Sequence, residues 1–293
     1  MTPSGGLSEL LQSLHLSMRR RSSSTLATSE SASARSGRAS SPRATAGGGR
    51  PQRTTVVLAT YNERENVRRL LPELLRLDDH LAVVVVDDAS PDGTAKEVEE
   101  VAAAFPGRVE LVSRPAKLGY GSAFVAGFRA ALRGDPDAVV SMDADFSHDP
   151  AALPDLLAAL AAHDVVIGSR FVEGVRILNW SLWRLILSRA ANAYVKLLLP
   201  APIADRTSGY RAYRSEVLRG IELERAASNG YAFLVELLEM VISGGFRIGE
   251  VSIVYEDRQR GRSKMDHRVV IEAAWRPWLL MLRRVDTLLR RRR

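Results

Sequence analysis

Short apolar runs alternate with amphipathic segments through the central part of the chain. The run "TTVVLA" is followed by a segment in which Leu70, Leu71, Leu74 and Leu75 recur at helical spacing. Four more strands are predicted at 81–88, 108–114, 137–145 and 164–171. The first of them, "LAVVVVDD", is an apolar run of the kind expected for a strand buried on both faces. Helical patterns separate them, at roughly 25-residue spacing. This alternation predicts an α/β fold, a mostly parallel Rossmann-like sheet with helices on both faces.

The N-terminal segment 1–53 differs sharply in composition from the rest of the chain. It is rich in Ser, Ala, Gly and Arg and has no periodic apolar pattern. Such a composition cannot bury enough apolar surface to offset the entropy of ordering, so a disordered tail is expected. An organellar transit peptide has a similar composition and stays open as an alternative. The folded domain is predicted to occupy 54–265.

Two apolar segments follow the last predicted strand. Residues 175–200 read as a long helix carrying Arg184, Arg189 and Lys196. It either packs on the domain with a solvated stripe or lines an acceptor site at a membrane. Residues 266–293 combine two tryptophans and a Leu/Met cluster with eight arginines, and Pro277 is expected to divide them into two short helices. This composition favours amphipathic helices in a bilayer interface, although packing on the protein itself is the alternative.

The distribution of charge along the chain limits the kinds of partner that the protein is expected to bind. The net charge is +7, but 1–53 and 268–293 each carry +6, which leaves −5 for 54–267. A basic stripe on the folded face is thus not expected, which argues against nucleic acid, whereas basic ends beside apolar stretches suit an anionic membrane surface. No run reaches the roughly 18 apolar residues of a membrane span. The absence of cysteine excludes disulfides, thiolate metal sites and a cysteine nucleophile.

Polar side chains follow several predicted strands at their carboxyl ends, where open α/β sheets bind ligands. The segments are "ATYNE", "VVDDASPDGT", "MDADFSH" and "GSRF". Neither a GxGxxG nor a GxxxxGK[ST] motif is present, so a dinucleotide oxidoreductase or a P-loop enzyme is not expected. If a turn breaks the strand alternation, Asp143 and Asp145 can reach one hard cation, with substrate phosphates completing the ligands. Their position opposite Asp87 and Asp88 and above Arg170 strengthens this interpretation.

Six blocks stand in this order between about residues 54 and 266: "TTVVLATYNERENV", "VVVVDDASPDGT", "MDADFSH", "GSRF", "DRTSGYRAYR" and "RQRGRSKM". Together they resemble family 2 glycosyltransferases of the GT-A fold. Within that family they look most like dolichol- or polyprenol-phosphate mannose synthases. The resemblance implies mannose transfer from GDP-mannose to a polyprenyl phosphate, with inversion and with Mg²⁺ or Mn²⁺. It also implies a peripheral enzyme on the cytoplasmic face of the membrane, with a membrane partner protein as a further expectation.

The resemblance also implies roles for individual residues. Nucleotide-sugar contacts are expected from Ala59, Tyr61, Glu63, Val86, Asp88, Asp143, Ala144, Asp145, Arg170, Arg258 and Lys264. Metal ligands are expected from Asp143, Asp145 and Ser147, where the family often has Gln in place of Ser147. Asp143, Asp145, Arg170 and Arg184 form the expected catalytic set, with both arginines meeting phosphates.

Neighbouring residues have less direct roles. Asp205 is expected to orient an arginine or the helix 177–200. His148 is interpreted as structural, because an anionic lipid phosphate needs no general base.

Two other functions stay open. The same fold could use UDP-glucose or UDP-GlcNAc with a polyprenyl phosphate or another acceptor. A non-enzymatic protein that binds nucleic acid or membranes through its arginine-rich ends is the remoter alternative, and the acidic centre of the chain argues against it.

Overall fold

The computed structural model describes residues 49–226, 228, 230–256, 277–279 and 281. The predicted tail 1–53 and the predicted interface helices 266–293 therefore lie almost entirely outside the described residues. Arg258 and Lys264 lie outside them as well.

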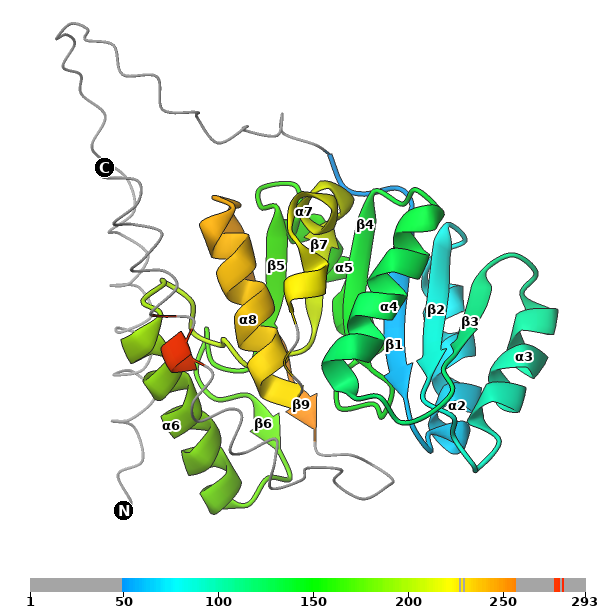
Figure 1. Ribbon diagram of the computed structural model, residues 1–293, viewed down its shortest axis with the longest axis horizontal. Coiled ribbons are helices and arrows are strands. Elements are labelled where there is room, and N and C mark those ends of the chain that lie inside the picture. Colours follow the sequence, from blue (N-terminus) through cyan, green and yellow to red (C-terminus); the bar gives the residue numbers. More distant parts are fainter. Residues whose placement is uncertain (1–48, 227, 229, 257–276, 280, 282–293) are drawn as a thin grey trace, which may run out of the picture. The chain divides into compact units, whose positions relative to one another are not determined.

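A seven-stranded sheet has the order β3-β2-β1-β4-β7-β5-β8 (Figure 1). Its strands are β1 (Thr54–Thr60), β2 (Leu81–Asp87), β3 (Val109–Ser113), β4 (Ala138–Asp143), β5 (Val165–Ser169), β7 (Arg211–Arg214) and β8 (Ile248–Ser252). All neighbouring pairs are parallel except those of β7, which is antiparallel to β4 and β5. The predicted mostly parallel α/β sheet is confirmed.

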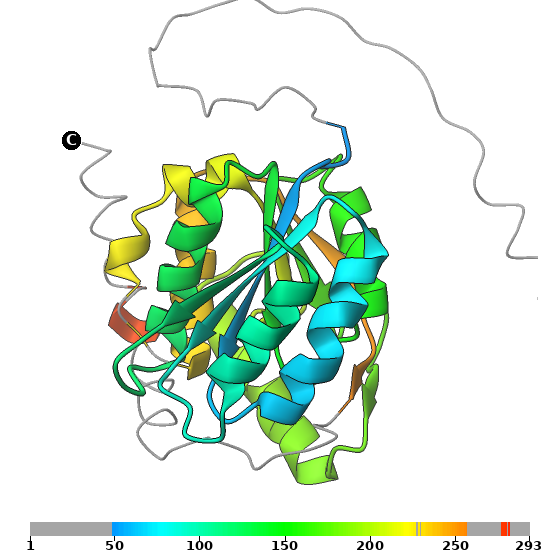
Figure 2. The ribbon, with the colours of Figure 1, turned by 90° about the vertical axis from the view of Figure 1, so that its right-hand side faces the viewer.

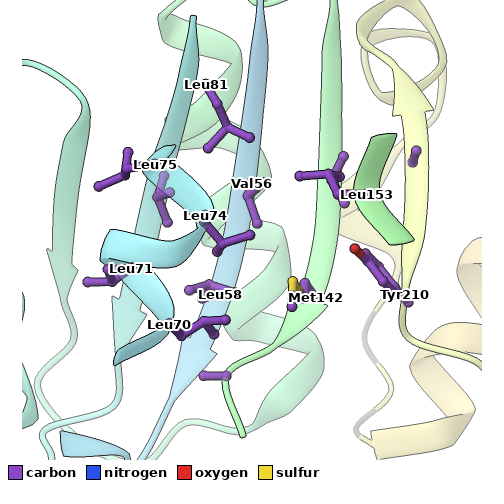
Figure 3. Close-up of a cluster of buried hydrophobic side chains, with 14 of the residues drawn as sticks. Val56, Leu58, Leu70, Leu71, Leu74, Leu75, Leu81, Met142, Leu153 and Tyr210 are labelled. Carbon is purple, nitrogen blue, oxygen red and sulfur yellow. The ribbon is translucent and has the colours of Figure 1, made fainter. Parts of the chain in front are cut away.

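Helices cover both faces of this sheet (Figure 2). One face carries α2 (Arg64–Leu77), α3 (Thr94–Ala104) and α5 (Leu153–Ala159), preceded by the 3-10 turn η2 (Pro150–Ala152). The other carries α4 (Tyr120–Arg133), α7 (Ser215–Gly220) and α8 (Gly230–Ser243), with the 3-10 turn η3 (Leu223–Arg225) between the last two. The leucines that predicted the first helix, at 70, 71, 74 and 75, are buried against Val56 and Leu58 (Figure 3).

The approach of α4 to the sheet depends on a glycine. A Cβ on Gly127 would lie 2.3 Å from Cγ1 of Val57 and 3.0 Å from Cγ2 of Val86. Real side chains do not approach so closely, so a residue with a side chain would push α4 away from β1 and β2.

The structure contains strands that the apolar runs did not predict. Strand β7 reads "RAYR", and it is buried at every position although two of its four residues are arginines. Arg211 is buried because its guanidinium donates to the carbonyl oxygens of Arg206, Ser208 and Leu234. A short parallel pair, β6 (Ile177–Leu178) and β9 (Tyr255–Glu256), forms a second sheet. A hydrophobic run could not reveal β7, because its arginines are satisfied by carbonyl oxygens from distant parts of the chain.

The predicted long helix within 175–200 is α6 (Leu182–Leu198). Only Asn192, Val195 and Leu198 of it are buried, and its other apolar residues are largely exposed: Leu182, Trp183, Ile186, Leu187 and Leu197. In the described part of the chain, no helix combines the length and the hydropathy needed to cross a bilayer.

Candidate active site

The carboxyl ends of three adjacent parallel strands form the base of the site. Ala59 of β1 pairs with Val86 of β2 on one side and with Asp143 of β4 on the other. Three residues that are far apart in the chain thus lie side by side, as the topology of parallel strands requires. Val86 is fully buried in the core, so a nucleotide contact by this residue stays a prediction.

The chain turns immediately after Asp143. Strand β4 ends at that residue, and Phe146 has a left-handed backbone with φ of 62°. Ala144 turns its side chain into the core, whereas Asp145 is buried and accepts hydrogen bonds on Oδ1 from the Ser147 backbone N–H at 3.1 Å and hydroxyl at 2.6 Å. The predicted break in strand alternation is present, and it brings Ser147 against the second carboxylate.

Asp143 is held by two neighbours. The Tyr120 hydroxyl donates to its Oδ1 at 3.1 Å, and its backbone N–H donates to Nδ1 of His148 at 3.0 Å. Its side chain keeps 27% of its surface exposed, so the carboxylate remains accessible. Tyr120, the first residue of α4, was not predicted as a site residue, and only its place in the glycine-containing "GYGS" could have suggested it.

His148 is buried and stacks on Tyr210 with ring centres 5.0 Å apart. Burial lowers the pKa of His148 below its ordinary value of 6.5, and this outweighs the opposing effect of Asp143 and Asp145. A neutral imidazole that accepts at Nδ1 carries its proton on Nε2. These contacts agree with the structural role expected of His148.

The paired carboxylates after β2 brace the surrounding loops. Asp87 accepts hydrogen bonds from the Thr60 hydroxyl at 3.0 Å and from the backbone N–H of Ser90 at 2.9 Å. Asp88 forms an ion pair with Arg114 and accepts the backbone N–H groups of Leu118 and Gly119 at 3.1 and 3.2 Å. The sequence did not identify Arg114. Since these groups occupy both carboxylates, a nucleotide contact by Asp88 stays a prediction.

The other residues of the "ATYNE" block lie at the surface edge of this region. Tyr61 is half-buried, with the Lys117 ammonium 4.5 Å from the centre of its ring. The Glu63 carboxylate accepts from the side-chain amide of Asn66 at 2.7 Å. Lys117 was also missed by sequence reasoning, because nothing in the local pattern separates it from any other surface lysine.

Arg170 and Asp205 form a buried ion pair with a fork-like geometry. Nε of Arg170 lies 2.6 Å from Oδ2 of Asp205, and Nη2 lies 2.8 Å from Oδ1. The Arg170 backbone N–H and the Thr207 backbone N–H donate to the same carboxylate. Burial raises the pKa of Asp205, but the charge and hydrogen bonds of Arg170 lower it more, and it falls below its ordinary value of 3.8. The expectation that Asp205 orients an arginine is confirmed.

Asp205 is also linked to α6. The side-chain amide of Asn192 donates to the Thr207 hydroxyl at 3.1 Å, and its oxygen accepts the Arg206 backbone N–H at 2.8 Å. The turn that holds Arg170 therefore holds the middle of this helix too.

Arg170 and Arg184 face the same aromatic ring. Their guanidinium carbons lie 5.8 and 4.7 Å from the centre of the Trp180 ring. Trp180 packs edge-on against Tyr255, which in turn packs edge-on against His148. This row of rings connects the turn that carries Asp145 with the exposed Arg184 on α6. The sequence named both arginines but gave no sign that Trp180 and Tyr255 would join them.

The mostly parallel sheet, with its acidic turn at the carboxyl edge of β4, is typical of glycosyltransferases of the GT-A type. The chain belongs to glycosyl transferase family 2, because residues 55–221 match that family. It is 44% identical to the polyprenol monophosphomannose synthase of Mycolicibacterium smegmatis over 77% of this chain and 85% of that protein. It is 42% identical to the undecaprenyl-phosphate mannosyltransferase of Micrococcus luteus over 75% of this chain and 90% of that protein.

The fold matches a solved structure. The glucosyl-3-phosphoglycerate synthase of Mycobacterium tuberculosis, in complex with Mn²⁺, UDP and phosphoglyceric acid, superposes with a TM-score of 0.57. The match covers 77% of this chain and 78% of that protein, at 21% sequence identity. The predicted GT-A fold is confirmed by this likeness.

Proposed function

We propose that this protein transfers mannose from GDP-mannose to the phosphate of a polyprenyl lipid, with inversion at the anomeric carbon. The observation that carries the proposal is the 44% identity with a polyprenol monophosphomannose synthase across most of both chains. The second relative is named for a polyprenyl phosphate acceptor as well. The accessible Asp143 carboxylate beside buried Asp145 supports a site for a nucleotide sugar at the carboxyl edge of the sheet.

Asp143 and Asp145 would hold a divalent cation, either Mg²⁺ or Mn²⁺, with the Ser147 hydroxyl as a further oxygen. The residues fit, because all the donors are oxygens and hard cations prefer oxygen ligands. Within the described ranges, no group of three or more His, Asp or Glu is placed to hold a metal by itself. Mg²⁺ is usually held by one or two carboxylates together with substrate phosphates, so donor phosphates would complete the shell. When bound, the cation would neutralise charge on the diphosphate leaving group.

The arginines would position the acceptor. Arg170 is locked by Asp205, whereas Arg184 is exposed on α6, and both face Trp180. The indole N–H of Trp180 is buried and has no acceptor among the described residues, which suits a site that receives an anion. An oxygen of the lipid phosphate would attack the anomeric carbon as the nucleoside diphosphate leaves from the opposite side. The phosphate has a second pKa of about 6 and is already anionic, so no base is needed.

The acceptor requires contact with a bilayer. We expect a peripheral enzyme on the cytoplasmic face, docked through α6 and residues 266–293 and assisted by a membrane partner protein. The strongly exposed side chains of Leu182, Trp183 and Leu197 support the contribution of α6.

The decisive experiment supplies purified full-length protein with radiolabelled GDP-mannose, a short polyprenyl phosphate and either Mg²⁺ or Mn²⁺. We expect label in the organic phase with the wild type and none with Asp145→Ala. Transfer from UDP-glucose or UDP-GlcNAc instead would show that the enzyme has the proposed fold but uses a different sugar nucleotide. Salt-dependent binding of duplex DNA without binding of any nucleotide sugar would reject the enzyme altogether.

A further inference from the structure

A hollow of about 210 Å³ lies between α6 and the segment 201–206 that follows it. Among the residues that the structure describes, its lining includes three cationic side chains, Arg189, Lys196 and Arg206, and no acidic one. Asn192 adds an amide, and Phe171 and Ile203 add apolar surface. Neither Arg170 nor Arg184 lines it, so the hollow is separate from the arginines assigned to the acceptor phosphate.

Two of the three cations are held in different ways. The Arg189 guanidinium carbon lies 5.3 Å from the centre of the Phe171 ring, which fixes the direction of a side chain that is otherwise exposed. Arg206 is 2% exposed, and one of its terminal nitrogens donates to the Ala201 carbonyl oxygen. Its buried Nε has no hydrogen-bond partner in the described part of the chain. A buried donor without a hydrogen bond costs free energy, so the Nε–H of Arg206 can still donate to an acceptor such as a phosphate oxygen.

Two carboxylates whose charge acts on Arg206 are committed elsewhere. Glu250 accepts the backbone N–H groups of Ala204 and Asp205 at 2.7 and 2.9 Å, and the Asp205 carboxylate is paired with Arg170. Burial lowers the pKa of Arg206, and the charges of Glu250 and Asp205 oppose this. An arginine keeps its charge at neutral pH despite such shifts, so the hollow carries an excess of positive charge.

The position of the hollow on α6 indicates what would enter it. Arg189 and Lys196 lie seven residues apart, and therefore on one face of the helix. This face lies between the buried side, marked by Asn192, and the exposed apolar side, marked by Leu182 and Ile186. In helices that lie in a bilayer interface, cations flank the apolar face at the depth of the phosphate groups.

We propose that the hollow lined by Arg189, Lys196 and Arg206 binds the phosphate of an anionic membrane lipid, as a second anion site beside the acceptor site. The site would fix the rotation of α6 on the bilayer, because Asn192 connects it to the turn that holds Arg170. The proposal rests on the membrane association proposed above but does not depend on which sugar is transferred.

The test is flotation of the full-length protein with vesicles of phosphatidylcholine alone or with added phosphatidylglycerol. For Arg189→Gln/Lys196→Gln we expect binding to the anionic vesicles to fall by about tenfold or more, with binding to neutral vesicles unchanged. The control Arg68→Gln/Lys96→Gln removes the same charge from the exposed surfaces of α2 and α3. An equal loss in the control would overturn the proposal, because it would show attraction by net charge alone.

A second variant separates a built site from a merely basic helix face. Ala193→Phe adds apolar bulk at the hollow without changing the charge. We expect it to lose the preference for anionic vesicles, although added aromatic surface by itself strengthens membrane binding. Unchanged or tighter binding to anionic vesicles would overturn the proposal. Inorganic phosphate at millimolar concentration provides a further comparison. If it stabilises the wild type against heat but not Ala193→Phe, and Ala193→Phe still binds anionic vesicles as the wild type does, the assignment to a lipid is overturned.

Discussion

Replacing Asp205 tests the reasoning about the buried ion pair most directly. Its carboxylate is fully buried and accepts hydrogen bonds from the backbone and guanidinium of Arg170 and from the backbone of Thr207. Asp205→Ala would remove all of these acceptors and leave a buried guanidinium without its partner. Breaking a buried pair in this way costs about 3–5 kcal/mol of the free energy of unfolding. Asp205→Asn keeps one oxygen acceptor, so we expect a smaller loss.

Removing both charges supplies the control. In Arg170→Met/Asp205→Leu no buried charge is left unpaired, so the double variant should be more stable than Asp205→Ala. Urea unfolding followed by tryptophan fluorescence measures the free energy of unfolding of each variant. Trp180 lies beside the Arg170–Asp205 pair and reports on it. We also expect Asp205→Asn to reduce mannosyl transfer, chiefly through a raised KM for the lipid phosphate, because Arg170 would lose its orientation. If Asp205→Ala lowers the free energy of unfolding by less than about 1 kcal/mol, Asp205 and Arg170 do not form the buried ion pair described here.

The same pair predicts a dependence on pH. The pKa of Asp205 is lower in the fold than its ordinary value of 3.8. The stabilisation is therefore complete above about pH 5 and is lost as the pH falls through the lowered pKa. The difference in stability between the wild type and Asp205→Asn should be constant near neutrality and should shrink below about pH 4. A constant difference down to pH 2 would contradict the depressed pKa.

Three further predictions concern the site and the packing beneath it. Asp145→Asn should lower mannosyl transfer by about 10²–10³-fold, with unchanged urea unfolding, because the amide keeps the shape but loses the charge that a cation needs; unaltered transfer would exclude Asp145 as a ligand. His148→Phe removes the acceptor of the Asp143 backbone N–H and should cost about 1–3 kcal/mol in urea unfolding. Gly127→Ala brings a Cβ against Val57 and should cost about 1–3 kcal/mol, in spite of the better helix propensity of alanine; a stabilised variant would show that α4 can move.

Matched controls separate these effects from general damage. Asp155→Asn changes an exposed carboxylate on α5 and should leave mannosyl transfer at the wild-type rate. Gly134→Ala follows the end of the same helix as Gly127, where the new Cβ would meet only the Ala131 carbonyl oxygen at 3.5 Å. It should change the free energy of unfolding by well under 1 kcal/mol, in contrast to Gly127→Ala.

The sequence by itself determined the layered α/β fold and the edge of the sheet where the site lies. Apolar runs report burial on both faces of a strand, and helical spacing reports one buried face, so both are local signals. The acidic turn at Asp143 and Asp145 could be found because it directly follows such a run. Six ordered blocks were enough to indicate the family, and the match at 55–221 bears this out.

Only the tertiary structure decided which polar groups are partners. Arg170 pairs with Asp205, 35 residues further along the chain, and Asp88 pairs with Arg114, 26 residues further along. The arginines of β7 donate hydrogen bonds to carbonyl oxygens of other elements. Such pairs depend on the order of the strands and on loop paths, which no local periodicity encodes. The cationic hollow beside α6 has the same origin, since Arg206 joins Arg189 and Lys196 only after the chain has turned back on the helix. Long-range hydrogen bonds and ion pairs form only when the fold brings distant residues together, whereas the pattern of buried positions follows from the residue order within each short segment.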